Sequence, residues 1–322
     1  MVADGREIIS NIIASQVDIH CKFGGVVPEI ASRKHLELLN TVIDKSLADA
    51  CVSLNELSAI AVTSGPGLVG ALLVGINTAK TMAWACGKPL VAVNHVNAHV
   101  AANYLVHEVL FPAVCLVVSG GHTSILYMEA RDSSKLIGIT RDDAAGEAFD
   151  KVARALDLGY PGGPAIDKKA EDGNIKAFDF PRAFSRQDTT FDFSFSGLKS
   201  AVINTLHNLK QRGEDINIAD LAASFQSAVV DILVEKTCLA AKCYAAKSVL
   251  IAGGVAANRH LRKSLEESLF GEDIRLNYPP TELCTDNAAM VACAGLDLYL
   301  KQDFASLDLN AVPVIDKFHQ VS

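Results

Sequence analysis

The stretch Ala59–Gly67 reads AIAVTSGPG and decides the class of fold. Its apolar first half is typical of a buried strand, and the Ser-Gly-Pro-Gly that follows predicts a tight turn. The next residues, Leu68–Cys86, have the apolar periodicity of a helix. A strand, a glycine-rich turn and a helix in that order predict one βα unit of an α/β fold.

The same order recurs along the chain, and it predicts largely parallel sheets with ligands at the C-terminal ends of the strands. Further strands are predicted at Leu90–Val93, Val114–Ser119 and Val249–Ala252. Further helices are predicted near Gly146–Leu156, Ser196–Leu209, Ile218–Tyr244, Asn258–Leu269 and Asp286–Leu300. Ser196 is expected to cap the helix that it begins.

The length of the chain indicates two lobes. It has 322 residues, of which 50% are hydrophobic and 20% charged, which is typical of a globular protein larger than one domain. We expect residues 1–112 and 286–322 to form the first lobe and residues 113–285 the second. No apolar run reaches the length of about 20 residues that a membrane span needs. Eight cysteines without paired spacing indicate a reducing, cytoplasmic compartment.

The charge of the chain limits its partners. The formal net charge of -8 opposes docking to a polyanion, so any contact with RNA must be local or assisted by another protein. Three basic spots are candidates for such a contact, although each is equally consistent with a solvated helix face. They are Arg33 with Lys34, Lys210 with Arg212, and Arg259 with Arg262 and Lys263.

A pair of histidines follows the second predicted strand. His95 and His99 are spaced i, i+4, which puts both imidazoles on one helical face, where they can share a metal ion. Two histidines without a third ligand also arise by chance. A metallopeptidase of the His-Glu-x-x-His type needs a glutamate directly after the first histidine, and this chain has Val96 there. The sequence therefore gives little support to peptide hydrolysis.

A third ligand is available far downstream. Asp286 lies in a Thr-Asp-Asn cluster at a predicted helix start, where a carboxylate either caps the helix or faces a ligand. Together with His95 and His99 it would complete a set of two histidines and one carboxylate. Such a set leaves coordination positions open for a substrate and suits iron(II) or zinc.

Two glycine-rich loops are candidates for binding a phosphate or an oxyanion. They are Val118–Thr123 and Ala252–Asn258, and each follows an apolar strand. Paired glycines let backbone N–H groups approach a ligand closely, and a helix N-terminus favours an anion. Either loop alone is equally consistent with a tight turn. Two of them in one chain indicate a nucleotide between the lobes.

Two carboxylates flank a third glycine-rich segment. Asp150 precedes and Asp167 follows the turn Tyr160–Pro164, which contains Gly163. Ionised carboxylates accept hydrogen bonds from hydroxyl groups, so this pair is a candidate for binding ribose or threonyl hydroxyls. Solvated acids beside a surface turn are the plainer interpretation.

These segments, in this order, resemble the TsaD family of enzymes that make threonylcarbamoyladenosine in tRNA, once described as O-sialoglycoprotein endopeptidases. The resemblance runs from about Gly24 to Met290. It rests on the segments Gly24–Glu29, Glu29–His35, Thr63–Gly67, His95–His99, Ser119–Thr123, Gly146–Asp150, Tyr160–Pro164, Phe193–Lys199, Gly253–Asn258 and Thr285–Met290.

The resemblance implies a two-lobe fold like that of actin, the sugar kinases and the heat-shock chaperone ATPases. It implies one divalent metal per subunit, iron(II) or alternatively zinc, held by His95, His99 and Asp286. It also implies contacts to threonylcarbamoyl-AMP from Val118, Ser119, Gly120, Gly121, His122, Asp150, Gly163, Asp167 and Asn258. In the family the threonylcarbamoyl group moves to the N6 amine of the adenosine 3′ of the anticodon in tRNAs reading ANN codons, and AMP departs.

The family further implies protein partners: a paralogous inactive subunit of the TsaB type, a small ATPase of the TsaE type, and a separate enzyme that makes the adenylate. Two departures from the family pattern stand out. Asn97 occupies a position that is usually acidic, which predicts a modest change around the metal ligands. We also expect the opening strand and the Glu-Thr-Ser-Cys-Asp-type loop of the family to be missing, with activity reduced. A metalloendopeptidase and a non-catalytic ATP-binding scaffold are the alternative functions.

Overall fold

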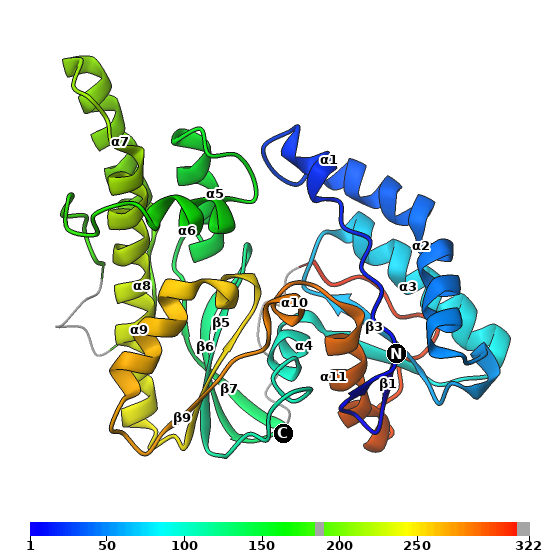
Figure 1. The fold of residues 1–322 in the computed structure, drawn as a ribbon. Coiled ribbons are helices and arrows are strands. Elements are labelled where there is room, and N and C mark those ends of the chain that lie inside the picture. Colours follow the sequence, from blue (N-terminus) through cyan, green and yellow to red (C-terminus); the bar gives the residue numbers. More distant parts are fainter. Residues whose placement is uncertain (184–189, 314–322) are drawn as a thin grey trace. The chain divides into compact units, whose positions relative to one another are not determined.

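The computed structural model describes residues 1–183 and 190–313 (Figure 1). Within these residues the chain divides into two compact units. Unit 1 comprises Met1–Ile19, Val26–Glu108 and the described residues from Thr285 onward. Unit 2 comprises His20–Gly25 and Val109–Cys284. Each unit combines strands and helices, so the α/β class predicted from the sequence is confirmed.

Unit 1 is built around a parallel pair of strands. In β3 and β4, Ile60 lies opposite Leu90 and Thr63 lies opposite Val93. A small antiparallel pair, β1 and β2, lies near the N-terminus, and α1 crosses from unit 1 into unit 2. The elements of unit 1 are β1 (Val2–Ala3), β2 (Glu7–Ile8), α1 (Val17–Cys21), α2 (Pro28–Ala50), η1 (Leu54–Glu56), β3 (Ile60–Gly65), α3 (Val69–Cys86), β4 (Leu90–Asn94), α4 (His95–Ala101) and α11 (Ala288–Leu300).

Helix α11 packs closely on the two parallel strands of unit 1. Gly295 permits this approach, because a Cβ atom at that position would lie 2.8 Å from the Cβ of Ala61. Helix α3 makes the connection between β3 and β4. By length and composition, α3 is the one helix in the described part of the chain that meets the criteria for crossing a membrane, a test that core helices also pass.

Unit 2 contains a five-stranded sheet in the order β7-β6-β5-β8-β9. Its elements are β5 (Ala113–Val118), β6 (Thr123–Ala130), β7 (Ser133–Ile139), α5 (Ala145–Ala155), α6 (Gly162–Ala170), α7 (Ser196–Arg212), α8 (Ile218–Cys243), β8 (Ser248–Ala252), η2 (Gly254–Ala257), α9 (Arg259–Leu269), β9 (Arg275–Asn277) and α10 (Thr281–Cys284). The predicted strands and helices of this unit correspond to β5, β8, α5, α7, α8 and α9.

The prediction of largely parallel sheets is wrong for this unit. Strand β5 is parallel to β8, and β8 to β9, but β5 is antiparallel to β6, and β6 to β7. The four residues Ser119–His122 join β5 to β6. A parallel crossover needs a dozen or more residues, so such a short connection forces a hairpin. Gly120 and Gly121, predicted to precede a helix, lie in this hairpin turn.

Aromatic side chains form the centre of the core of unit 2. Phe149 of α5 and Phe225 of α8 pack edge to face with ring centroids 5.3 Å apart, and both are fully buried. Phe193 and Phe195 are also fully buried and stack with centroids 6.1 Å apart. Edge-to-face and offset contacts are the favourable geometries for aromatic pairs. These rings fix α5, α8 and the segment that leads into α7.

Helix α7 begins differently from the prediction. Ser196 is the first residue of the helix and does not cap it. The carboxylate of Asp142 caps it instead, because its Oδ1 accepts bonds from the backbone N–H groups of Phe195 and Ser196, at 2.8 and 3.2 Å. The hydroxyls of Ser194 and Ser196 donate to Oδ2. Burial acts to raise the pKa of Asp142, but these hydrogen bonds outweigh it and lower that pKa.

Helices α5 and α6 meet through a backbone contact that only glycine allows. A Cβ atom on Gly162 would lie 2.5 Å from the Cα of Asp150. The N–H of Gly162 donates to Oδ1 of Asp150 at 2.7 Å, so the side chain of α5 binds the N-terminus of α6. Burial raises the pKa of Asp150, although the Gly162 bond and the charge of Arg154 act in the opposite direction.

The raised pKa of Asp150 predicts a pH-dependent stability. The folded protein binds a proton on this carboxyl more tightly than the unfolded chain does, so the ionised group destabilises the fold, and this effect disappears as pH falls through the raised pKa. Asp150→Asn keeps an oxygen for the Gly162 N–H but carries no charge. We therefore expect its Tm to exceed that of the parent near pH ~8, and the difference to shrink towards pH ~4.

Thermal unfolding followed by circular dichroism across this pH range measures the effect. Asp172→Asn is the matched control, because Asp172 is an exposed carboxylate of the same unit. A Tm difference between Asp150→Asn and the parent that stays constant with pH contradicts the assignment.

Candidate functional site

The two histidines lie on one helix whose start is fixed by an asparagine. Strand β4 ends at Asn94, whose Oδ1 accepts hydrogen bonds from the N–H groups of Val96 and Asn97, at 2.8 and 3.2 Å. This is an N-cap, and it makes His95 the first residue of α4. His99 lies one turn further on, so both imidazoles are on the same face of α4, as the sequence predicts.

Asp286 lies between α10 and α11, and it does not cap the helix that follows. Asn287 is the cap, because its Oδ1 accepts from the N–H of Met290 at 2.9 Å. A second N–H of that helix, on Ala289, donates to Oδ1 of Asn11. The capping interpretation of Asp286 is therefore excluded, and its carboxylate is available to the histidines.

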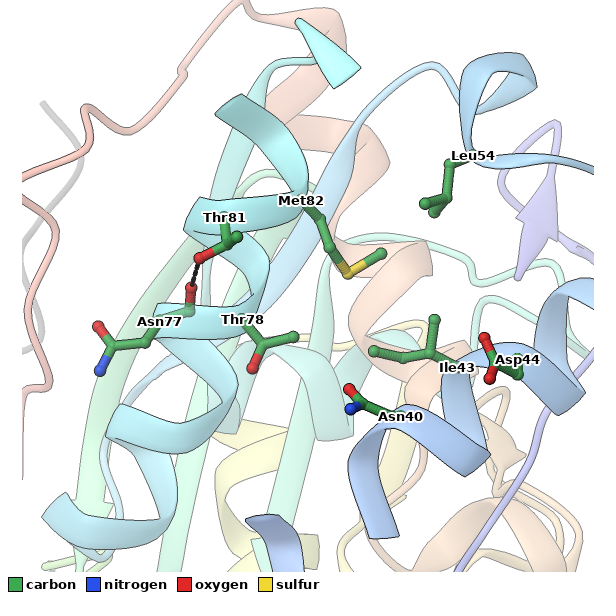
Figure 2. Close-up of a pocket in the computed structure, with 8 residues that line it drawn as sticks. All are labelled: Asn40, Ile43, Asp44, Leu54, Asn77, Thr78, Thr81 and Met82. Carbon is green, nitrogen blue, oxygen red and sulfur yellow. Dashed lines mark hydrogen bonds between the residues drawn. The ribbon is translucent and has the colours of Figure 1, made fainter. Parts of the chain in front are cut away.

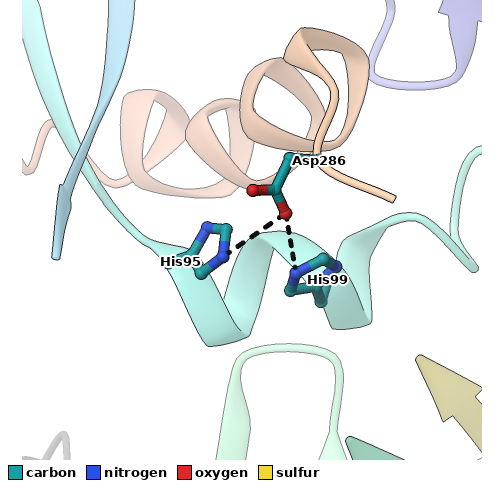
Figure 3. Close-up of side chains that lie close together, drawn as sticks. All are labelled: His95, His99 and Asp286. Carbon is teal, nitrogen blue, oxygen red and sulfur yellow. Dashed lines mark ion pairs between the residues drawn. The ribbon is translucent and has the colours of Figure 1, made fainter. Parts of the chain in front are cut away.

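The three candidate ligands lie together in unit 1 (Figure 3). Oδ1 of Asp286 is 3.5 Å from Nε2 of His95 and 3.3 Å from Nε2 of His99. One potential ligand atom from each residue lies within 4.8 Å of the others. The side chain of His99 is 3% exposed, that of His95 20% and that of Asp286 78%. The group therefore extends from a buried imidazole to an accessible carboxylate.

These separations fit a shared cation. Metal–ligand bonds of about 2.1 Å place neighbouring ligand atoms roughly 3.0–3.4 Å apart in tetrahedral or octahedral geometry. The distances from Asp286 to the two imidazoles are close to that range. Two imidazole nitrogens and one carboxylate oxygen suit iron(II) or zinc, and three protein ligands leave positions open. The donor set present is therefore compatible with a divalent metal.

The surroundings of His99 differ from those of most ligating histidines. Its Nδ1 is buried and has no hydrogen-bond partner among the described residues. A ligating histidine usually donates its second ring N–H to a carboxylate, carbonyl or water. Asn97 does not fill this role, because it is exposed and its side chain makes no hydrogen bond within the described part of the chain. Packing and the contact of Nε2 with Asp286 therefore orient this imidazole.

The first ligand loop joins β5 to β6 in unit 2. The N–H of Ser119 donates to the carbonyl of His122 at 2.8 Å, and the His122 N–H donates to Oγ of Ser119 at 3.2 Å. The hydroxyl of Thr123 accepts from the N–H of Ala145 at the start of α5. Val118, the last residue of β5, is fully buried. The loop is therefore rigidly attached to the N-terminus of α5.

Two glycines outside this loop make room for it. A Cβ atom on Gly146 would lie 2.5 Å from the carbonyl oxygen of Ser119, and one on Gly253 would lie 2.4 Å from that of Val118. Gly253 also has a φ of +92°, which favours glycine. At both positions the backbone lies so close to another backbone segment that only glycine fits. This revises the prediction that Gly253 approaches a ligand.

Other glycines of the predicted loops face open space instead. A Cβ atom would meet no heavy atom within 4 Å at Gly120, Gly121, Gly163 or Gly254. Among the described residues, packing therefore does not require glycine at these four positions. Gly120 and Gly121 lie in the β5–β6 loop, Gly163 in the first turn of α6 and Gly254 at the start of η2.

The two predicted carboxylates have different environments. Asp150 binds the N–H of Gly162, as described above. Asp167 lies on α6, where Gly163 precedes it by four residues, so both are on one helical face. Oδ2 of Asp167 accepts a hydrogen bond from Nε of Arg259 at 2.9 Å. Asp167 is therefore part of an ion-pair cluster between α6 and α9, and not a solvated acid.

Asn258 has a clear structural role. Its Oδ1 accepts from the N–H of Leu261 at 2.9 Å and so caps α9, while its Nδ2 donates to Oε1 of Gln226 in α8 at 3.1 Å. The side chain is buried. Both ends of its carboxamide are therefore engaged within unit 2, a role that the sequence does not reveal.

The predicted basic spots are mostly engaged in ion pairs. Arg33 pairs with Glu29, Lys34 with Glu37, Arg212 with Glu214 and Lys263 with Glu267. Arg262 donates to the carbonyls of Ala256 and Pro279 and lies over the ring of Tyr278. The interpretation of these spots as solvated helix faces therefore needs one correction. In α9, Arg259 binds Asp167, and Arg262 binds two backbone carbonyls.

A cavity lies elsewhere in unit 1. It has a volume of about 610 Å³, and Figure 2 shows it between α2 and α3 of unit 1. Its lining is a mixture of amide, hydroxyl and apolar groups from Asn40, Ile43, Asp44, Leu54, Asn77, Thr78, Thr81 and Met82. None of the predicted site residues lines it. Helix α2 itself, which contains three of these residues, was not predicted.

Solved structures with a similar fold include two HypF proteins. The HypF of T. kodakarensis aligns with a TM-score of 0.61 at 16% identity, covering 84% of this chain and 44% of that one. A full-length HypF in a phosphate- and nucleotide-bound form aligns with a TM-score of 0.57 at 14% identity, covering 80% and 41%. At these identities the likeness concerns the fold alone.

Sequence comparison is more specific. The protein from Moorella thermoacetica named tRNA N6-adenosine threonylcarbamoyltransferase is 55% identical over 97% of this chain and 92% of its own length. The protein of the same name from Geobacillus thermodenitrificans is 57% identical over 97% and 91%. The family model described as TsaD, tRNA N6-adenosine threonylcarbamoyltransferase, matches residues 7–293. The chain therefore belongs to the TsaD family.

Proposed function

We propose that this chain transfers the threonylcarbamoyl group from threonylcarbamoyl-AMP to the N6 amine of the adenosine 3′ of the anticodon, in tRNAs reading ANN codons. The observation that carries the proposal is the convergence of His95, His99 and Asp286 in a chain that the TsaD family model matches over residues 7–293. The reaction forms a bond between the N6 nitrogen and the carbamoyl carbon, and AMP leaves with the electrons of the broken anhydride bond.

The two units are, in this proposal, the lobes of an actin-like and sugar kinase-like fold, with the adenylate held between them. The lobes are residues 1–112 with 286–322, and residues 113–285. The likeness of the chain to HypF supports a fold of this class.

The loops of unit 2 bind the adenylate. Backbone N–H groups at Gly120, Gly121 and Gly163 donate to its anionic oxygens, because these are the positions where a ligand can approach the chain closely. The loop residues Val118, Ser119 and His122 shape the same site. The carboxylates of Asp150 and Asp167 accept hydrogen bonds from hydroxyls of the ligand. Asn258 acts by fixing η2 and α9, since its carboxamide is engaged.

His95, His99 and Asp286 hold one divalent metal, iron(II) or alternatively zinc. When bound, this metal supplies Lewis-acid polarisation of an oxygen of the adenylate. The residues of the chain hold the group in place. The buried imidazole of His99 lies on its inner side, and the accessible Asp286 completes it from the segment between α10 and α11.

The remaining catalysis is positional. The N6 amine of adenosine is weakly basic, so bringing it close to the carbamoyl carbon and stabilising the departing AMP are the main contributions. An anticodon-loop base can be splayed out of its stack and presented to a site on the protein surface. The loop N–H groups then stabilise the negative charge that develops on the leaving phosphate.

The reaction takes place in the cytoplasm with the help of partners. A TsaB-like paralogous subunit and a TsaE-like small ATPase are the partners that membership of the TsaD family suggests. A need for partners agrees with the net charge of -8 and with the ion pairing of most of the predicted basic spots. Eight free thiols in the described residues are in keeping with a reducing compartment.

Two other functions compete with this proposal. A metalloendopeptidase shares the metal group, but Val96 stands where a catalytic glutamate is needed. A non-catalytic ATP-binding scaffold shares the fold. Both predict that no modified nucleoside forms, so one assay separates them from the transferase.

We expect the chain, together with its TsaB-like and TsaE-like partners and the enzyme that makes the adenylate, to convert adenosine to threonylcarbamoyladenosine in an ANN-reading tRNA. Threonine, bicarbonate and ATP are the supplied reactants, and mass spectrometry of digested nucleosides is the measurement. A tRNA with a different base 3′ of its anticodon is the control. Absence of product with every component present contradicts the proposal, and nucleotide binding without product selects the scaffold.

The metal group predicts the effect of losing one ligand. Asp286→Ala leaves two imidazoles, so we expect metal affinity to fall by roughly tenfold or more. Titration with iron(II) under anaerobic conditions, and with zinc, followed by calorimetry or elemental analysis, measures this loss. Asp49→Ala removes an exposed carboxylate from α2 of the same unit and is the matched control. Equal affinities of the parent and Asp286→Ala rule out the proposed centre.

A further inference from the structure

An arginine at the start of α9 binds two carboxylates of α6. Nε of Arg259 donates to Oδ2 of Asp167 at 2.9 Å, and its Nη2 donates to Oε1 of Glu171. Asp167 and Glu171 are four residues apart, so their side chains lie on one face of α6. One guanidinium thus connects two helices through two different carboxylates. We call Arg259, Asp167 and Glu171 the α6–α9 ion-pair cluster.

The three members of this cluster differ in exposure. The side chain of Asp167 is 14% exposed, whereas that of Arg259 is 64% exposed. The guanidinium therefore covers the carboxylate from the solvent side. Within the described residues, Oδ2 is the only oxygen of Asp167 that accepts a hydrogen bond, which leaves Oδ1 available. Gly163, where a side chain would meet nothing within 4 Å, lies one turn away on the same helical face.

The backbone of Arg259 is held in place. It directly follows Asn258, whose carboxamide both caps α9 and binds Gln226 of α8. The guanidinium is therefore attached to a fixed helix start and not to a loose loop. The hydrogen bonds that Arg259 donates to Asp167 and Glu171 raise the pKa of its guanidinium.

A carboxylate beside a phosphate-bearing ligand creates an electrostatic problem. Two negative groups in contact repel each other, and a largely buried carboxylate has little water to screen it. A fixed guanidinium next to Asp167 offsets that repulsion with a positive charge. It also limits the rotation of the side chain, so that the remaining oxygen keeps one direction.

We propose that Arg259 is a positioning residue for the adenylate: it holds the side chain of Asp167 in one orientation, so that the Oδ1 atom accepts a hydrogen bond from a ribose hydroxyl. The inference rests on the proposed function, because it takes Asp167 as a contact of the ligand. Glu171 holds the second arm of the guanidinium. Lysine cannot replace Arg259, since an ammonium group lacks the planar set of donors that reaches two carboxylates at once.

Direct binding of an RNA phosphate by Arg259 is the competing role. Its guanidinium already donates to two carboxylates, so a phosphate would have to displace one of them. The two roles make opposite predictions when Arg259 and Asp167 are changed together. A positioning residue has no effect once Asp167 has lost its charge, whereas a residue that binds RNA itself retains its effect.

The test is a double-mutant cycle of Arg259→Gln and Asp167→Asn. AMP is the probe for binding by calorimetry, and the full reaction gives KM for threonylcarbamoyl-AMP and kcat. We expect Arg259→Gln to weaken AMP binding about tenfold and to raise KM similarly, with kcat little changed. The double variant should bind AMP no more weakly than Asp167→Asn alone. Arg259→Lys should restore at most part of the affinity.

Lys263→Gln is the matched control, because Lys263 lies one turn further along α9 and pairs only with Glu267 among the described residues. Melting temperatures of all variants separate a folding defect from a binding defect, and Glu171→Gln provides a milder variant that leaves the Asp167–Arg259 pair intact. Additive losses in the cycle, or unchanged AMP binding in Arg259→Gln, overturn the inference. So does a parent protein that binds no AMP.

The outcomes also separate this inference from the proposed function. If the parent binds AMP and the cycle is non-additive but no tRNA is modified, the transferase proposal fails and the role of Arg259 stands. If the tRNA is modified but Arg259→Gln behaves like the parent, the transferase proposal stands and the role of Arg259 fails.

Discussion

The side-chain caps of Asn94 and Asn287 are the interactions on which the candidate metal centre depends. Each asparagine accepts hydrogen bonds from the first N–H groups of its helix, at the start of α4 and of α11. A helix start leaves N–H groups that must find acceptors, and an adjacent histidine or aspartate would otherwise supply them. The caps meet this need, and Oδ1 of Asp286 lies 3.5 Å from Nε2 of His95 and 3.3 Å from Nε2 of His99.

Glycines have a comparable role in unit 2, and they fall into two classes. Gly146, Gly162 and Gly253 let one backbone lie directly on another, and a Cβ atom at any of them would collide with a carbonyl or a Cα. These contacts hold the β5–β6 loop, α5, α6 and η2 together. Gly120 and Gly163 have no neighbour in the direction of a side chain. The packed glycines thus fix the loops, whereas packing does not require glycine at the open positions.

The sequence was informative where the signal is local. The apolar periods predicted β3, β4, α3 and α8 closely, and the i, i+4 spacing put His95 and His99 on one face. Prediction from the sequence failed where the deciding contact comes from a distant residue, or where one local pattern is consistent with two structures. A Gly-Gly pair after a strand is consistent with a hairpin turn and also with a turn into a helix. For Gly120 and Gly121, the short connection to β6 shows that the turn is a hairpin. The cap on α7 comes from Asp142, more than fifty residues upstream of Ser196, so no local pattern could identify it.

Charge pairing explains why the basic runs were hard to interpret. A run such as Arg259, Arg262 and Lys263 looks like a surface for a polyanion, because the sequence shows cations but not their partners. In the folded chain the partners are Asp167, Glu171, Glu267 and backbone carbonyls. A cation that is already paired releases little free energy to a phosphate, since one ion pair must break as another forms. With a net charge of -8, this argues against the α9 run as the main source of attraction for tRNA.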